Sequence, residues 1–456
     1  MCGFIAGKNL EKDLKEVLPD ISYRGIDGYE GYLEVDTVHT AQGTNLIQLA
    51  HTALPIVNLY HPEAIQPLYT DANAPCLFVG EIFNYEEFGD YYHDGQAMVD
   101  AYAKRLPNHL GAAKSLQDFH KFDGFWSFVS IAQGNLLAAT DYLGQKPIYY
   151  RKDVEVIASE IDILKQFGPV TPNRLFLSNV AKWGYDPMGL TPWNEIYQVP
   201  PGHYYYSGSC HRYWDWNKVE KTNLYDDMKK AVKLRMGGQR SVAQLISGGL
   251  DSTIVYGLLK EQGVEIDTPL HVNNFEKDYA ELVCGKDNLI HITLEDEITD
   301  LEALQIHQSP VDLGSVKPQI AMARKLKELN YNVVMTGDGA DELFGGYRRA
   351  KEYDSQYSDV FAELPYYHLP KLDRTMMRST VELRTPYLSP QVIAHALEIP
   401  YEARNGEKKV LKETFGHLVP ETILKRNKMP LKSAEIHNDP ITKRMENLRL
   451  WQSLVK

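Results

Sequence analysis

The pattern of apolar segments changes part-way along this chain, and that change restricts the fold more than any other feature. Before about residue 200 the chain holds short β-rich runs broken by turn residues, as in 76–84, 125–133 and 136–143. Such runs are typical of antiparallel hairpins. From about residue 223, short apolar runs alternate with longer helical ones, which is the pattern of a parallel, doubly wound sheet. A chain that contains both patterns is predicted to form two domains.

The length of the chain agrees with that division. The chain has 456 residues, about three times the commonest domain length, so each part can bury a core of its own. An aromatic and proline-rich stretch, 199–216, separates the two patterns. We therefore expect an antiparallel α+β domain at residues 2–216 and an α/β domain at residues 217–456.

Charge and cysteine content argue against several classes of protein. The net charge is −13, from 61 acidic and 48 basic residues, so neither duplex nucleic acid nor an anionic membrane is an expected partner. No apolar run approaches the roughly twenty residues that span a bilayer, and the N-terminus lacks the order of a signal peptide. The 4 cysteines are too scattered for a disulfide framework or a zinc site. We expect a cytoplasmic protein that binds small molecules.

A glycine-rich loop between a β-rich run and a helix is the strongest candidate for a nucleotide site. Residues 247–252 read Ser-Gly-Gly-Leu-Asp-Ser. Unhindered glycine backbone and two hydroxyls before a helix can surround a phosphate. The loop lacks the spacing and the lysine of a Walker loop, so transfer of a γ-phosphoryl group is not implied. Asp251 is a candidate Mg²⁺ ligand, because that cation prefers carboxylate and phosphate oxygens.

A second glycine-rich loop, 336–347, contains three acids and follows a predicted strand. Open α/β sheets bind ligands at the carboxyl ends of their strands. Asp341 is therefore a candidate second Mg²⁺ ligand, and Asp338 a candidate to face the reacting centre. Farther on, Lys408 and Lys412 share one face of a predicted helix, where one of them can neutralise developing phosphate charge.

Cys2 is a candidate nucleophile because of its position. Removal of Met1 would leave a thiol and a free α-amine on the same residue. An α-amine titrates near about pH 8 and can act as the local base that makes the thiolate. The alternative is a small buried cysteine near the terminus. Residues 3–7 form a predicted strand that would fix this end of the chain.

These motifs occur in one order with several others, and together they resemble the glutamine-hydrolysing asparagine synthetases of the bacterial B type. The other motifs are residues 24–25, 80–84, 142–150, 158–161 and 381–388. The resemblance covers nearly the whole chain. It implies an N-terminal class II glutaminase, with the antiparallel β-sandwich between helices of the N-terminal-nucleophile fold. A doubly wound parallel sheet of the ATP pyrophosphatase type would follow, with ammonia passing internally between the two sites.

The resemblance also implies a reaction: ATP-dependent amidation of aspartate to asparagine through an acyl-adenylate, with release of AMP and pyrophosphate. Glutamine or ammonia would be the nitrogen donor, and ATP and Mg²⁺ the cofactors. The partners would be small molecules, and a homodimer is left open.

Residue roles follow from the same resemblance. In the first domain, Cys2 would be the nucleophile, Gly80 an oxyanion donor and Asp94 the ligand of the glutamine amino group. Further glutamine contacts would be Glu81, Leu54 and Ile56. In the second domain, Asp338 and Lys408 would be catalytic, and Asp251 and Asp341 would hold Mg²⁺. ATP would contact Leu245, Ser247, Gly248, Gly249, Asp251, Ser252 and Gly337.

The chain departs from the family pattern at several positions. Ala53 stands where an arginine would bind the glutamine carboxylate, and Val79 where an asparagine would donate to the oxyanion. Loss of one oxyanion donor costs about 2.7 to 4 kcal/mol in other enzymes. We therefore expect ammonium to outperform glutamine, unless another cation such as Arg24 reaches the carboxylate. Asp338 replaces a frequent glutamate, and residues 316–318 replace serine, threonine and proline, which leaves the acceptor open.

Three other interpretations stay open. A relative could amidate a different carboxylate or use a different amine, with Lys317 recruiting a second anionic group. Pyrophosphatase-loop proteins also modify tRNA, but those that transfer sulfur need more cysteines, and this acidic chain shows no basic RNA surface. A degenerate, non-catalytic partner is disfavoured because Cys2, Asp94, Asp251 and Asp341 are all present.

Overall fold

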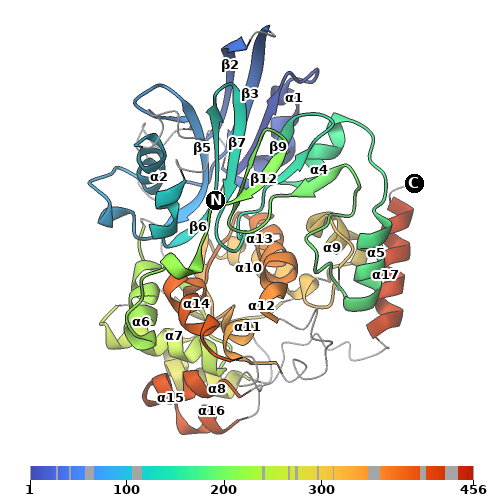
Figure 1. Ribbon diagram of the computed structural model, residues 1–456. Coiled ribbons are helices and arrows are strands. Elements are labelled where there is room, and N and C mark those ends of the chain that lie inside the picture. Colours follow the sequence, from blue (N-terminus) through green and yellow to red (C-terminus); the bar gives the residue numbers. More distant parts are fainter. Residues whose placement is uncertain are drawn as a thin grey trace.

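A computed structural model describes most of the chain (Figure 1). The described residues are 2–26, 29–40, 43–56, 66–104, 116–238, 242–264, 268–272, 276–294, 297–311, 313–347, 360–400, 407–426 and 440–454. Two antiparallel sheets occupy the first half of the chain and one parallel sheet the second. The predicted fold class is therefore confirmed.

The first antiparallel sheet holds the N-terminal strand near its middle. Its strands, in spatial order, are β10 (Ile196–Gln198), β8 (Tyr149–Arg151), β9 (Val156–Ala158), β1 (Gly3–Lys8), β3 (Gly43–Thr52) and β2 (Glu30–Thr40). Strand β1 pairs with β3 from Gly3 opposite Thr52 onward, and with β9 on its other side. Pairing with β3 fixes the backbone directly after Cys2, and β9 adds pairing on the other side from Ile5 onward.

The second antiparallel sheet packs on the first. Its spatial order is β12 (Ser209–Arg212), β11 (His203–Tyr206), β7 (Asn135–Thr140), β6 (Gly124–Ala132), β5 (Pro75–Ile82) and β4 (Leu68–Tyr69). Apolar side chains of both sheets, among them Phe4, Leu49, Leu77 and Val129, form one buried cluster between them. The stretch predicted to separate the domains contributes the β11–β12 hairpin to this sheet.

The helices of the first half are short. They are α1 (Leu14–Val17), α2 (Asp94–Ala103), α4 (Ile161–Leu164) and α5 (Arg174–Trp183). The 3₁₀ helix Leu18–Arg24 crosses beneath β1 and β3. Helix α5 has regular caps, because the Asn173 side chain accepts from two backbone N–H groups at its start and Gly184 ends it in a left-handed conformation.

The parallel sheet has the order β15 (Ile290–Ile292), β14 (Thr268–Val272), β13 (Val242–Leu245), β16 (Val333–Met335) and β17 (Glu382–Arg384). Its helices are α6 (Leu224–Leu234), α7 (Leu250–Glu261), α8 (Lys277–Cys284), α9 (Asp300–His307), α10 (Val316–Glu328), α11 (Ala340–Phe344), α12 (Val360–Glu363), α13 (Leu369–Met377), α14 (Pro390–Leu397), α15 (Lys409–Phe415), α16 (Glu421–Lys425) and α17 (Pro440–Leu454). Strands β13, β16 and β17 are neighbours, so the loops after their carboxyl ends meet at one edge. None of the helices in the described ranges is long and apolar enough to cross a membrane.

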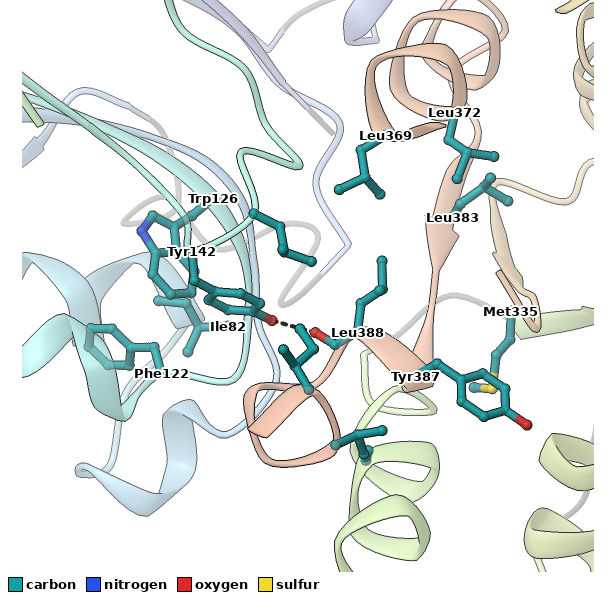
Figure 2. Packing of buried hydrophobic residues seen from close by; sticks show 14 of the residues in the cluster. Ile82, Phe122, Trp126, Tyr142, Met335, Leu369, Leu372, Leu383, Tyr387 and Leu388 are labelled. Carbon is teal, nitrogen blue, oxygen red and sulfur yellow. Dashed lines mark hydrogen bonds between the residues drawn. The ribbon is translucent and has the colours of Figure 1, made fainter. Parts of the chain in front are cut away.

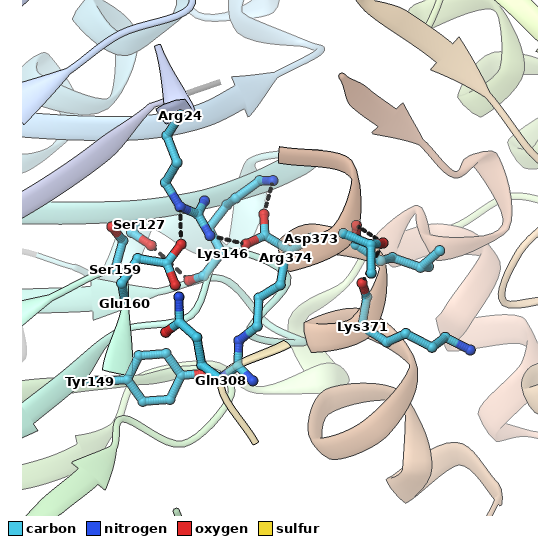
Figure 3. A network of polar contacts seen from close by, with 12 residues as sticks. Arg24, Ser127, Lys146, Tyr149, Ser159, Glu160, Gln308, Lys371, Asp373 and Arg374 are labelled. Atoms are coloured by element: carbon cyan, nitrogen blue, oxygen red, sulfur yellow. Dashed lines mark hydrogen bonds and ion pairs between the residues drawn. The ribbon is translucent and has the colours of Figure 1, made fainter. Parts of the chain in front are cut away.

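Apolar and charged contacts join the two halves. Figure 2 shows Trp126 and Tyr142 of the first half in one buried cluster with Tyr387 and Leu388 of the second, and the Tyr142 hydroxyl donates to the Leu388 carbonyl at 2.8 Å. Figure 3 shows buried Asp373 of α13 accepting from Lys146 Nζ at 2.6 Å. The two halves are therefore held in one fixed arrangement.

Candidate active sites

Cys2 lies at the start of β1, with only 8% of its surface exposed. The backbone N–H of Leu54 donates to its thiol, and the carboxylates of Glu81 and Asp94 lie nearby. Burial raises the pKa of the Cys2 thiol, and both carboxylates raise it further. The thiol therefore needs a base to become a nucleophile.

Gly80 has a conformation that requires glycine. Its φ is +132°, and a Cβ at this position would lie 1.9 Å from the carbonyl oxygen of Phe125. No other residue fits without moving strand β6. At Gly80 the backbone of β5 therefore lies directly against the backbone of β6, with no space for a side chain.

Two carboxylates of the predicted glutamine site are buried together. Asp94 begins α2, and its Oδ2 accepts from the Ile82 backbone N–H at 2.9 Å. Burial raises the pKa of Asp94 to about 7, although backbone N–H groups oppose the shift. Burial also raises the pKa of Glu81 well above its ordinary value, with Glu382 and Asp94 adding to the shift. The structure therefore brings Cys2, Glu81 and Asp94 together, as predicted.

Two of the positions that depart from the family pattern lie in the apolar surroundings of Cys2. Ala53 and Val79 belong to the same buried cluster as Cys2. Leu54 and Ile56 are buried in the segment that follows β3. No charge faces Cys2 from position 53 or 79.

The suggestion that Arg24 reaches the glutamine carboxylate is wrong. Its guanidinium is buried and donates to Glu160 and, at 2.6 Å, to Asp373 Oδ2. In Figure 3 the side chain points from its helix toward these two carboxylates. Both are strong charge-assisted partners, which hold Arg24 at the junction of the two halves.

The loop 247–252 joins β13 to α7, as predicted. Gly248 has a φ of +77°, and a Cβ there would lie 2.8 Å from the Tyr279 side chain, so glycine is required. The hydroxyls of Ser247 and Ser252 lie 3.1 Å apart. Leu245 ends β13, and Gly249 caps α7 without a side chain. The loop leaves backbone and hydroxyl groups at the start of a twelve-residue helix.

Three charged side chains from separate segments meet beside this loop. Lys408 Nζ lies 2.5 Å from Asp251 Oδ2 and 2.5 Å from Asp341 Oδ1. Burial acts to lower the pKa of Lys408, but the two carboxylates outweigh it and raise that pKa. Gly337 and Gly346 permit this contact, since a Cβ on Gly346 would lie 1.7 Å from Asp341 Oδ1 and one on Gly337 would press on the backbone at Ser252.

The helix predicted to carry Lys408 and Lys412 on one face begins later than expected. Helix α15 starts at Lys409, and Lys408 precedes it in a left-handed conformation with a φ of 49°. That turn directs the Lys408 side chain to the two aspartates, a result that helical spacing alone does not predict.

Asp338 follows strand β16 and lies at the same edge of the sheet. Its Oδ2 accepts from the Thr336 hydroxyl at 2.7 Å. The carboxyl reaches solvent, but the surrounding protein raises its pKa, an effect that Thr336 and the nearby Lys371 oppose. The Lys317 ammonium group pairs with another carboxylate, since its Nζ lies 2.6 Å from Asp300 Oδ1.

The donor set of Asp251 and Asp341 fits Mg²⁺. Both carboxylates already converge on a single cation, the Lys408 ammonium group. Magnesium is usually bound by one or two carboxylates together with substrate phosphates and water. Two carboxylates beside a phosphate-type loop provide that environment.

Sequence reasoning missed two residues that face the predicted glutamine pocket from the second half. Glu382 and Arg384 lie on β17, and Arg384 Nη2 is 3.5 Å from Glu81 Oε2. The alternation of acid and base in residues 381–388 was a usable signal, but a contact between domains leaves no local pattern in the sequence.

Two family models match the chain. A model for asparagine synthase matches residues 223–357 and 351–451. A model for a glutamine amidotransferase domain matches residues 1–214. Together they account for both halves.

Curated relatives resemble the chain over most of its length. It is 24% identical over 444 residues to asparagine synthetase B [glutamine-hydrolyzing] of Escherichia coli, covering 83% of this chain and 73% of that protein. It is 25% identical over 430 residues to asparagine synthetase [glutamine-hydrolyzing] 3 of Arabidopsis thaliana, covering 83% and 70%. It is 24% identical over 400 residues to asparagine synthetase [glutamine-hydrolyzing] of Homo sapiens, covering 76% and 70%.

Proposed function

The chain belongs to the asparagine synthase family, and we propose that it makes asparagine from aspartate, ATP and glutamine, releasing glutamate, AMP and pyrophosphate. The observation that carries this is the meeting of Asp251, Asp341 and Lys408 at the nucleotide loop. The same chain holds a buried cysteine at its second position beside two carboxylates. We place the glutaminase in residues 2–216 and the synthetase in residues 217–456.

The first half performs the hydrolysis. After removal of Met1, the α-amine of Cys2 takes the thiol proton, and the sulfur attacks the amide carbon of glutamine. The backbone N–H of Gly80 donates to the oxyanion that forms. Asp94 and Glu81 bind the glutamine ammonium group, and Leu54 and Ile56 line the pocket. The protonated α-amine returns the proton to the leaving nitrogen, ammonia departs, and water then hydrolyses the thioester to release glutamate and the free thiol.

The second half activates the acceptor. Leu245, the 247–252 loop and Gly337 bind ATP. A carboxylate oxygen of aspartate attacks the α-phosphorus, and pyrophosphate leaves. Lys408 offsets the negative charge that develops on the phosphates, while Asp338 faces the reacting centre. Ammonia then attacks the acyl carbon of the adenylate and AMP leaves.

Asp251 and Asp341 would hold Mg²⁺ together with the phosphates, where the cation supplies charge neutralisation and orientation. The substrates are small metabolites of the cytoplasm, and we propose that the protein works there. Sedimentation equilibrium tests the homodimer that the family resemblance leaves open.

One assay tests the proposal. Purified protein is supplied with ATP, Mg²⁺ and aspartate, plus either glutamine or ammonium. We expect equal amounts of AMP, pyrophosphate and asparagine, and glutamate only with glutamine. Glutamate supplied as the acceptor in place of aspartate is the matched control, because it differs by one methylene. Failure to release pyrophosphate with either nitrogen source would contradict the proposal.

A further inference from the structure

We propose that Arg384, on strand β17 of the second half, is a positioning residue for the glutamine pocket of the first half, where it holds the Glu81 carboxylate ready for the glutamine ammonium group. The inference rests on the proposed function of Cys2, Glu81 and Asp94. It adds that the glutamine pocket is completed by a residue of the synthetase.

The Arg384 guanidinium is rigidly held. The residue is fully buried, and its Nη1 donates to the carbonyls of Arg235 at 2.8 Å and Gly237 at 2.6 Å. Its Nε donates to Glu382 Oε1 at 2.8 Å. These bonds fix the plane of the guanidinium and direct Nη2 at Glu81.

Nη2 has Glu81 as its charged neighbour. The distance from Arg384 Nη2 to Glu81 Oε2 is 3.5 Å, and within the described ranges this nitrogen makes no hydrogen bond of its own. A buried guanidinium nitrogen is costly to leave without an acceptor. The contact with Glu81 is therefore what offsets its burial.

Glu81 is placed at the centre of the pocket. It follows Gly80 in β5, and its carboxylate is close enough to Cys2 to act on the thiol. Strand β6 fixes its backbone, since Glu81 lies opposite Phe125. The position of its carboxylate is set by Arg384.

The charges around Glu81 leave room for one further cation. The titratable or charged groups that face it are the N-terminal α-amine and Cys2 from β1, Tyr85 after β5, Asp94 from α2, and Glu382 and Arg384 from β17. Three carboxylates, Glu81, Asp94 and Glu382, thus face two cationic groups, the Arg384 guanidinium and the N-terminal α-amine. An ammonium group on the substrate is the cation that completes the set, and Arg384 favours the charged form of Glu81 that receives it, because the guanidinium lowers the pKa of Glu81 against the larger effect of burial.

The same segment of chain reaches the nucleotide loop. Beyond Arg384, the Tyr387 hydroxyl donates to the backbone carbonyl of Asp251 at 3.1 Å. Residues 384–387 therefore connect the glutamine pocket directly to the ATP site, so the pocket is complete only where the two halves are docked.

The test compares Arg384→Gln with Arg235→Gln in the full chain. Arg235 is the matched control because it is equally buried and lies over the same Phe83 ring, at 4.5 Å against 5.2 Å, yet it pairs with Asp123. Glutamate release gives the glutamine KM and kcat, and ammonium-dependent pyrophosphate release reports on the second half. We expect Arg384→Gln to raise the glutamine KM about tenfold or more, and Arg235→Gln to change it less than about twofold.

The pH profile separates positioning from mere folding. Loss of the guanidinium should move the midpoint of glutamine kcat/KM to higher pH, because the pKa of Glu81 then rises further. Glu382→Gln should move it to lower pH, because one buried negative charge is removed. A residue that only supported the fold would lower activity without moving the midpoint.

Each outcome decides the matter. Equal glutamine KM values for Arg384→Gln and Arg235→Gln, with unmoved pH midpoints, would overturn the inference. If Arg384→Gln also loses ammonium-dependent activity, Arg384→Lys decides, since a raised KM with a shifted midpoint supports the role and an unchanged profile refutes it. If the unaltered protein releases no glutamate, the proposed glutaminase fails, and this inference fails with it.

Discussion

The proposed glutamine pocket around Cys2 and the nucleotide loop differ in how their buried charges are balanced. At the nucleotide loop, Lys408 lies 2.5 Å from each of two aspartates, so the site holds a cation before any substrate arrives. Around Cys2, three carboxylates face two cationic groups, the Arg384 guanidinium and the N-terminal α-amine, and the pocket is also lined by an apolar cluster. The two aspartates of the nucleotide site therefore already have a cationic partner, the Lys408 ammonium group. The glutamine pocket gains a cation only when the ammonium group of its substrate binds.

This difference predicts where each site is fragile. A site that already holds an ammonium group depends on its carboxylates, so the loss of either should stop its chemistry. In a pocket with excess negative charge, activity should depend on the cationic group of the substrate and on pH. Substitutions that add contacts to the substrate should be able to improve it. The following predictions test that contrast.

The largest effect is expected at the nucleotide loop. Asp251→Asn should lower pyrophosphate release at least about a hundredfold with either nitrogen source, because phosphate charge is then uncompensated during attack at the α-phosphorus. Both activities should fall together. Asp226→Asn is a matched control, since Asp226 also lies in the first turn of a helix but contacts Asn223. Ammonium-dependent turnover near that of the control would remove the loop from the ATP site.

The next effect is confined to the glutamine pocket. Cys2→Ala should abolish glutamate release but leave ammonium-dependent synthesis within about twofold of normal, because the nucleophile serves only the first reaction. Cys210→Ala is the control, as Cys210 is a partly buried cysteine that contacts Tyr150. Unchanged glutamine hydrolysis by Cys2→Ala, in protein shown by mass spectrometry to have lost Met1, would refute the N-terminal nucleophile.

Much of this contrast could be predicted from the sequence, because local patterns and motifs determine it. The runs at 76–84, 125–133 and 136–143 are strands, and the Ser-Gly-Gly-Leu-Asp-Ser loop opens a helix. The long β2–β3 hairpin was missed, since its strands mix polar and apolar residues and are partly exposed. Strand β17 was missed because three residues carry too little periodicity.

Contacts between the halves could not be predicted. Arg24 was a candidate for the glutamine carboxylate, yet Glu160 and Asp373 hold it elsewhere. Lys408 reaches the two aspartates from a left-handed residue before its helix. In each case the deciding partner is distant in the sequence, so no spacing rule identifies it.

A third prediction concerns the contact that fixes one site relative to the other. Asp373 accepts from Arg24 and Lys146, each at 2.6 Å, and is almost fully buried. Asp373→Asn should lower the free energy of unfolding by about 3 to 5 kcal/mol, because two buried cations lose their charged partner. Asp162→Asn, which breaks an exposed pair with Lys165, should cost about 0 to 1 kcal/mol.

The pH dependence of that difference has a definite sign. Burial acts to raise the pKa of Asp373, but Arg24 and Lys146 outweigh it and hold the pKa below its ordinary value. The stabilisation is therefore fully present above the unfolded pKa of about 3.9 and is lost as pH falls below it. Denaturant titrations should show a constant difference between about pH 5 and pH 8. A difference that grew as pH fell would contradict the assignment.

The smallest effect is an improvement of the glutamine pocket. Ala53 and Val79 lie with Cys2 in an apolar cluster, so the glutamine carboxylate meets no charge there, and its desolvation is poorly offset. Ammonium should therefore be the better nitrogen donor.

Ala53→Arg with Val79→Asn should lower the glutamine KM and raise kcat, together about three- to tenfold, because one change adds a carboxylate partner and the other an oxyanion donor. Ala53→Met adds bulk without charge and should not help. Ala53→Arg alone should act on KM and Val79→Asn alone on kcat, so the two terms can be separated. If the unaltered protein already hydrolyses glutamine with a low KM, another group binds that carboxylate. The pocket would then be as complete as the nucleotide site, and the contrast between them would be confined to the ammonium end of the substrate.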